Sequence, residues 1–138
     1  MVEISVAYEG NFRCLSIHAP SGAVLPTDAP KDNLGKGEAF SPTDLTATSL
    51  GACMLTTMAI VAQKKSLQVD LAGLTAKVRK HMTSEPPRRI ARIEVQVSIP
   101  LPATHPNRGI LERTALSCPV SLSLHPEVEQ AVTFLWAE

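Results

Sequence analysis

The residues best suited to chemistry in this chain are its three cysteines, Cys14, Cys53 and Cys118. A thiol can act as a nucleophile once it loses its proton, can form a disulfide, or can bind a metal. There is no C-x-x-C pair, and none of the four histidines stands at metal-binding spacing from a cysteine. Three cysteines are too few, and an odd number, for a disulfide scaffold. We therefore expect thiol chemistry with no metal and no bound cofactor.

Cys53 lies in the stretch LGACMLTTM, within a run from 45 to 62 that carries no charge. The run is just long enough to cross a membrane, but its five hydroxyl residues favour a buried core helix. Free cysteine is often no more than a small buried hydrophobe. Cys53 is therefore either a structural residue or a nucleophile placed in the protein interior.

Cys118 lies in the stretch LSCPVSLSLHPEV and directly precedes Pro119, where a helical turn is expected to begin. Backbone N–H groups at such a start can stabilise a thiolate. The alternative is that Cys118 is a passive N-cap. Cys14 occurs in no comparable setting, and we expect it to be structural.

The elements that position these thiols follow from periodicity. Apolar residues alternate with polar ones along five segments, which predicts strands near 2–9, 12–19, 72–83, 92–101 and 127–137, and a short strand near 23–30. Two helices are expected, at 42–64 and 104–118. The longer one begins with Ser41 as N-cap, Pro42 in the first position and Asp44 completing a capping box. The predicted order is β-β-β-α-β-β-α-β, an α+β class with mainly antiparallel sheet, in one domain over residues 1–138.

Composition narrows the classes of partner. Lys plus Arg and Asp plus Glu both number 13, and aromatic residues make up only 4%, so we expect no nucleic-acid partner. The first residues lack the apolar core of a signal peptide, which predicts a cytoplasmic protein with no membrane association. A long uncharged helix must be hidden on every side. Because one sheet covers only one side, we expect a homodimer.

The chain resembles the OsmC/Ohr family, the osmotically induced and organic-hydroperoxide-resistance proteins. The resemblance rests on FSPTDLTATSLGACMLTTM at 40–58 and ALSCPVSLSLHPEV at 115–128, with a proline-containing helix start before the first cysteine and a C-P pair some sixty residues later. The likeness is greatest to the general OsmC-like branch. It implies a single OsmC-like domain in an intertwined homodimer, with sheets wrapped around central helices.

The resemblance also implies a thiol-dependent peroxidase that reduces organic hydroperoxides to alcohols, with hydrogen peroxide as a further candidate substrate. Cys53 would be the peroxidatic residue and form a sulfenic acid. Cys118 would be the resolving residue and form a disulfide with it. An external dithiol, with a lipoyl-type dithiol as one candidate, would then reduce the disulfide.

A buried thiol has a raised pKa, and Cys53 is about three turns inside its helix, too far for help from the helix start. It therefore needs a cationic neighbour, and the resemblance implies an arginine from the early strands, for which Arg13 is the candidate. The alternative is that Arg13 is a strand-end residue whose charged head reaches water. The hydroperoxide-resistance branch holds its arginine with a glutamate directly after the proline of the helix start. Thr43 stands there in this chain, so Asp44 and Glu38 are the candidate partners, although Asp44 is also the expected capping-box acid.

Two other functions are compatible with the sequence. The same apolar dimer cleft could serve a non-catalytic binder of a lipid-like ligand, which would need neither cysteine. A redox sensor would use the cysteines once, without turnover.

Overall fold

The computed structural model describes all residues from 1 to 138, and it confirms the predicted α+β class and element order. The elements are β1 (Ile4–Gly10), β2 (Arg13–His18), β3 (Val24–Asp28), η1 (Lys31–Asn33), α1 (Pro42–Lys64), β4 (Thr75–Met82), β5 (Ile90–Pro102), α2 (Arg108–Leu116), α3 (Pro119–Ser123) and β6 (Glu129–Ala137). The chain divides into two compact units, residues 1–46 and 47–138, which are described separately. A single domain over residues 1–138 stays a prediction.

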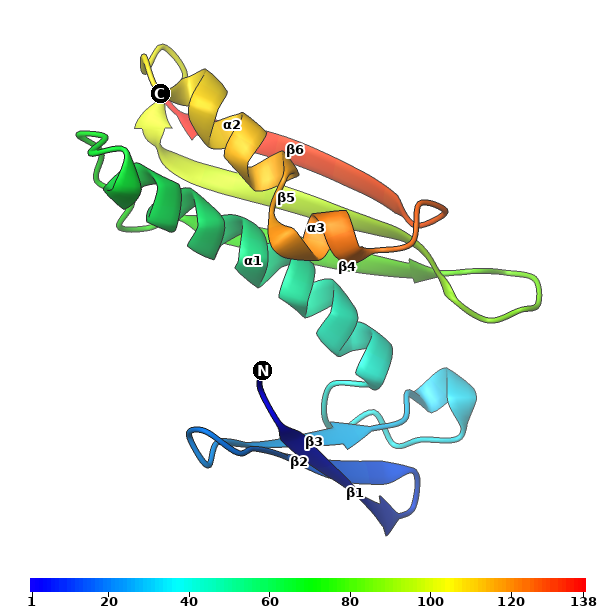
Figure 1. Ribbon diagram of the computed structural model, residues 1–138. Coiled ribbons are helices and arrows are strands. Elements are labelled where there is room, and N and C mark those ends of the chain that lie inside the picture. The colour runs from blue at the N-terminus through cyan, green and yellow to red at the C-terminus, as the bar shows by residue number, and fades with distance from the viewer. The chain divides into compact units, whose positions relative to one another are not determined.

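The first unit is built on a three-stranded antiparallel sheet in the order β1-β2-β3 (Figure 1). Its register pairs Tyr8 with Cys14 and Arg13 with Asp28. Since residues that pair across strands point to the same face, Arg13 shares a face with Asp28, and Cys14 lies on the opposite face.

The apolar face of β1 is not covered within the first unit. Alternation predicted a half-buried strand, and the strand does form, but Ile4, Val6 and Tyr8 are 58%, 64% and 67% exposed. The residues of this unit that are buried are polar: Thr27, Asp28 and Ser41. A sheet with an apolar face and no apolar core needs a covering surface.

Helix α1 begins and ends where its sequence predicts. The N–H of Ser41 donates to Asp44 Oδ2 at 3.0 Å, and the N–H of Asp44 donates to Ser41 Oγ at 3.1 Å. These reciprocal bonds form a capping box, with Pro42 as the first helical residue. The helix ends at Lys64, whose charge suits the negative end of the helix dipole.

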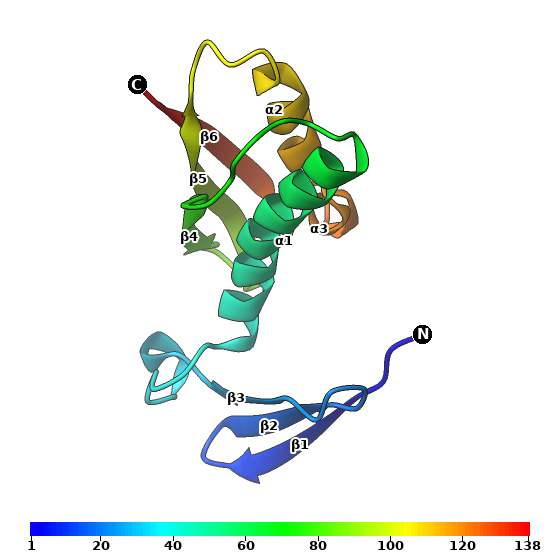
Figure 2. The same ribbon diagram turned by 90° about the vertical axis from the view of Figure 1, so that its left-hand side faces the viewer.

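The second unit contains the apolar core. Its sheet has the order β4-β5-β6, with β4 and β5 antiparallel and β5 and β6 parallel. Helices α1, α2 and α3 all lie on one face of this sheet (Figures 1 and 2). The buried side of β5 packs there against apolar residues of α1 and α2, in a cluster that includes Leu50, Met54, Met58, Ile93, Val95, Val97, Ile99, Leu111 and Ala115.

Helix α1 crosses the sheet at close range. A Cβ atom at Gly51 would lie 2.6 Å from Val78 Cγ2, so only glycine allows this approach to β4. The buried residues of α1 recur at helical spacing, as Ala47, Leu50, Gly51, Met54, Met58 and Ala62. By length and hydropathy α1 is also able to cross a membrane, a property that core helices of soluble proteins share.

Candidate active site

Cys53 stands at the edge of the buried stripe of α1. Gly51 and Met54 beside it are buried, whereas Ala52 is exposed and Cys53 itself is half-buried. Its thiol packs against the core cluster of the second unit while remaining partly open. This position gives the thiol an apolar setting without sealing it off.

Cys118 is the N-cap of α3, and its side chain is fully buried. Its backbone is extended, with φ −67° and ψ 154°, and Pro119 follows as the first helical residue. The N–H of Ser121 donates to Cys118 Sγ at 3.4 Å. The helix start predicted from the C-P pair is therefore present, with the sulfur as the capping acceptor.

The second unit brings Cys53 and Cys118 together. Cys53 packs against the core cluster to which Cys118 belongs, and the two thiols are close enough for each to shift the pKa of the other. Sixty-odd residues of chain separate them, so the fold rather than local sequence creates the pair. Two adjacent free thiols can be oxidised to a disulfide.

Hydrogen-bond donors set the protonation of Cys53. Burial raises its pKa, but the backbone N–H of Val120, the hydroxyl of Thr57 and the thiol of Cys118 lower it, and together they outweigh burial. The pKa of Cys53 is therefore lower than that of an ordinary cysteine. The sequence argument expected that a cation would be needed, and it overlooked these neutral donors.

The pKa of Cys118 shifts in the opposite direction, upward. Burial is the largest influence and raises its pKa, the N–H of Ser121 opposes this, and the neighbouring Cys53 raises it further. The N–H groups of the helix start therefore do favour a thiolate at Cys118, but burial and Cys53 outweigh them. The result is a pair in which the pKa of Cys53 lies below, and that of Cys118 above, the ordinary value for cysteine.

The hydroxyl of Thr57 is placed differently from those of Thr46 and Thr114, two other helical threonines. Thr46 and Thr114 donate to the carbonyls of Pro42 and Ile110, one turn earlier, as helical threonines commonly do. The hydroxyl of Thr57 instead lies 3.7 Å from Cys53 Sγ. Its oxygen is thus placed against a reactive atom.

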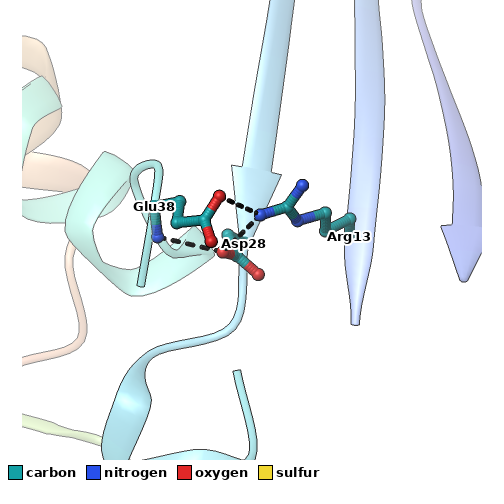
Figure 3. A network of polar contacts seen from close by, with 3 residues as sticks. All are labelled: Arg13, Asp28 and Glu38. Carbon is teal, nitrogen blue, oxygen red and sulfur yellow. Dashed lines mark hydrogen bonds and ion pairs between the residues drawn. The ribbon is translucent and has the colours of Figure 1, made fainter. Parts of the chain in front are cut away.

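In the first unit, Arg13 is held by two carboxylates (Figure 3). Its Nη2 donates to Glu38 Oε2 at 2.8 Å and to Asp28 Oδ2 at 3.3 Å. The N–H of Glu38 also donates to Asp28 Oδ2, at 3.0 Å. This backbone bond, opposed by burial and aided by Arg13, lowers the pKa of Asp28.

Of the two predicted acidic partners, Glu38 makes an ion pair with Arg13, while Asp44 makes the capping box of α1. Asp28 was missed by the sequence analysis. A polar residue that ends a strand carries little signal, because the register that sets it opposite Arg13 depends on the turn between β2 and β3.

A family model described as OsmC-like protein matches residues 35–132. Among solved structures, a protein from Psychrobacter arcticus 273-4, named as an osmotic stress induced and detoxification response protein, is 43% identical. It has a TM-score of 0.88, and the match covers 97% of this chain and 96% of that one. A comparison with curated proteins finds no match.

Two more distant structures show the same fold. An organic hydroperoxide resistance protein OsmC from Legionella pneumophila is 17% identical with a TM-score of 0.74, over 98% of this chain and 96% of that one. An organic hydroperoxide resistance protein from Elizabethkingia anophelis is 17% identical with a TM-score of 0.77, over 99% of this chain and 96% of that one. With the family model matching most of its length, this chain belongs to the OsmC-like family.

Proposed function

We propose that this protein is a thiol-dependent peroxidase that reduces organic hydroperoxides to alcohols. The observation that carries the proposal is the packing of Cys53 against the core cluster that contains Cys118, with pKa values that move apart, down at Cys53 and up at Cys118. Such a pair supplies a nucleophile and a protonated thiol side by side. The names of the Legionella and Elizabethkingia proteins support the same class of substrate.

In the first step, the Cys53 thiolate attacks the distal oxygen of the peroxide. A sulfur–oxygen bond forms, the oxygen–oxygen bond breaks, and the leaving alkoxide takes a proton to become the alcohol. Cys53 is oxidised to a sulfenic acid as the peroxide is reduced. The donors around Cys53 favour this step because they lower the pKa of Cys53 and so raise the fraction present as thiolate.

In the second step, Cys118 attacks the sulfenic sulfur of Cys53, and water leaves as the disulfide forms. The proton on Cys118 leaves with the hydroxide of the sulfenic acid, so the charges balance. An external dithiol, for which a lipoyl-type dithiol is the candidate, then exchanges with this disulfide and restores both thiols as it becomes a disulfide itself.

Thiol titration tests the function directly. One equivalent of cumene hydroperoxide per chain should remove two titratable thiols, and a dithiol should restore them. No loss of thiols would favour a binder of a lipid-like ligand. Loss without steady-state turnover in the presence of dithiol would favour a redox sensor.

Removing the Thr57 hydroxyl should slow the first step. Thr57→Val keeps the shape of the side chain, and losing the hydrogen bond raises the pKa of Cys53, so less thiolate is present at pH 7. In a Cys14→Ser background, alkylation of Cys53 by iodoacetamide should be roughly two- to tenfold slower at pH 7. Thr57→Ser should restore the rate, and an unchanged pH profile for Thr57→Val would exclude this role.

We also propose that the protein acts as a homodimer. The exposed apolar side chains of β1, and Ile60 on the open side of α1, support a second copy as the covering surface. We expect a mostly apolar interface on the order of 2,000 Å² or more in total.

Light scattering at micromolar concentration should give twice the mass of one chain. Val6→Asp should shift the protein towards monomer, because it places a charge on the apolar face of β1. Ser5→Asp, on the opposite face of the same strand, is the matched control and should remain dimeric. A stable monomer of the parent protein would contradict the proposal.

Two further assignments stay predictions. Arg13 as a stabiliser of the Cys53 thiolate is implied by the resemblance, and its ion pairs with Glu38 and Asp28 show how the guanidinium is held within its own unit. A cytoplasmic location suits a protein whose cycle begins from reduced thiols.

A further inference from the structure

Gln130 places an amide on a face that is otherwise apolar. It lies on β6 opposite Ile93, which is fully buried, and its strand neighbours on that face are Val132, Phe134 and Trp136. A polar group in such a position is unfavourable unless both its donor and its acceptor find partners.

Both ends of this amide bind one residue of α3. Gln130 Nε2 donates to the carbonyl of Ser121 at 3.1 Å, and Gln130 Oε1 accepts from Ser121 Oγ at 2.6 Å. Helix α3 has five residues and none of them is buried. A helix this short is not stable by itself, so outside contacts must fix its orientation.

The same turn of α3 serves both thiols. The N–H of Ser121 donates to Cys118 Sγ at 3.4 Å, and the preceding N–H, of Val120, lowers the pKa of Cys53. The amide of Gln130 therefore holds the residue whose N–H donates to Cys118, and which directly follows the residue whose N–H acts on Cys53.

We infer that Gln130 is a positioning residue for the thiol pair, which acts through Ser121 to aim two successive N–H groups of α3 at Cys53 and Cys118. This inference rests on the proposed function for its catalytic meaning. Its test, however, uses the reduced protein and no peroxide.

The variant Gln130→Met keeps the length of the side chain and removes both hydrogen-bonding ends. In a Cys14→Ser background, we expect Cys53 to be alkylated by iodoacetamide roughly three- to tenfold more slowly at pH 7, with the midpoint of its pH profile moved upward. Mass spectrometry assigns the alkylated cysteine. The matched control is Gln96→Met, on the solvent-facing side of β5 in the same sheet, which should leave the profile unchanged.

Ser121→Ala provides a milder change, should Gln130→Met fail to fold. It removes only the hydroxyl and keeps the backbone bond to Gln130, so we expect a smaller shift in the same direction. A parent-like pH profile in both variants, even with lowered thermal stability, would show that Gln130 only holds the fold and would overturn the inference. Absence of peroxide consumption by the parent protein would refute the proposed function. The alkylation profiles would still test the role of Gln130, because they are measured without peroxide.

Discussion

Replacing Cys53 by serine should abolish peroxide consumption. A serine hydroxyl at neutral pH is a far weaker nucleophile than a thiolate, and Cys118, the only adjacent thiol, is fully buried with a raised pKa. Consumption of cumene hydroperoxide with excess dithiol, followed by a ferrous–xylenol orange assay, should fall to the rate of dithiol alone.

Two controls accompany this variant. Cys14→Ser should consume peroxide at the parent rate, because Cys14 belongs to the first unit and lies on the strand face opposite Arg13. The circular dichroism spectrum of Cys53→Ser should match that of the parent protein. Substantial remaining activity would move the peroxidatic role away from Cys53.

Replacing Cys118 by serine should separate the first step from the second. Cys53 keeps its donors from Thr57 and Val120, so one equivalent of peroxide should still be reduced. Without a resolving thiol, the sulfenic acid should accumulate and be trapped by dimedone, with an adduct on Cys53 visible by mass spectrometry. Excess peroxide should carry the same residue on to sulfinic and sulfonic acid.

The pattern across the two variants is the decisive result. Dimedone adducts on Cys118 in Cys53→Ser would reverse the roles of the two cysteines. Loss of reaction in both variants, with no trapped sulfenic acid in either, would falsify the two-step mechanism. A second turnover by Cys118→Ser with added dithiol would show that the reductant can resolve the sulfenic acid directly.

Much of the fold could be predicted because its signals are local. The capping box at Ser41 and Asp44 gives the start of α1, and strict alternation gives β4, β5 and β6. The cover of β1 could not be predicted, since an alternating strand shows only that one face is apolar. Which surface meets that face is not encoded in its spacing.

The cysteines of the candidate site could be predicted, but not what surrounds them. Thr57 was within reach of sequence reasoning, because residues four apart on a helix are neighbours and Cys53 is its partner at that spacing. The influence of the Val120 N–H on Cys53 could not be predicted, since it depends on the packing of α3 near α1. The direction of the pKa shift at Cys118 also depends on its burial, which the C-P pair does not reveal.

The donors that surround Cys53 act on the oxidised protein as well as on the reduced one. Groups that stabilise a thiolate stabilise the reduced state relative to the disulfide, which raises the reduction potential of the pair and makes the disulfide a stronger oxidant. A Cys53–Cys118 disulfide would therefore accept electrons from a dithiol more readily than a structural disulfide does. Weakening the donors at Thr57 or Val120 would slow attack on peroxide and also make the oxidised protein harder to recycle, so the same two donors tune both halves of the cycle.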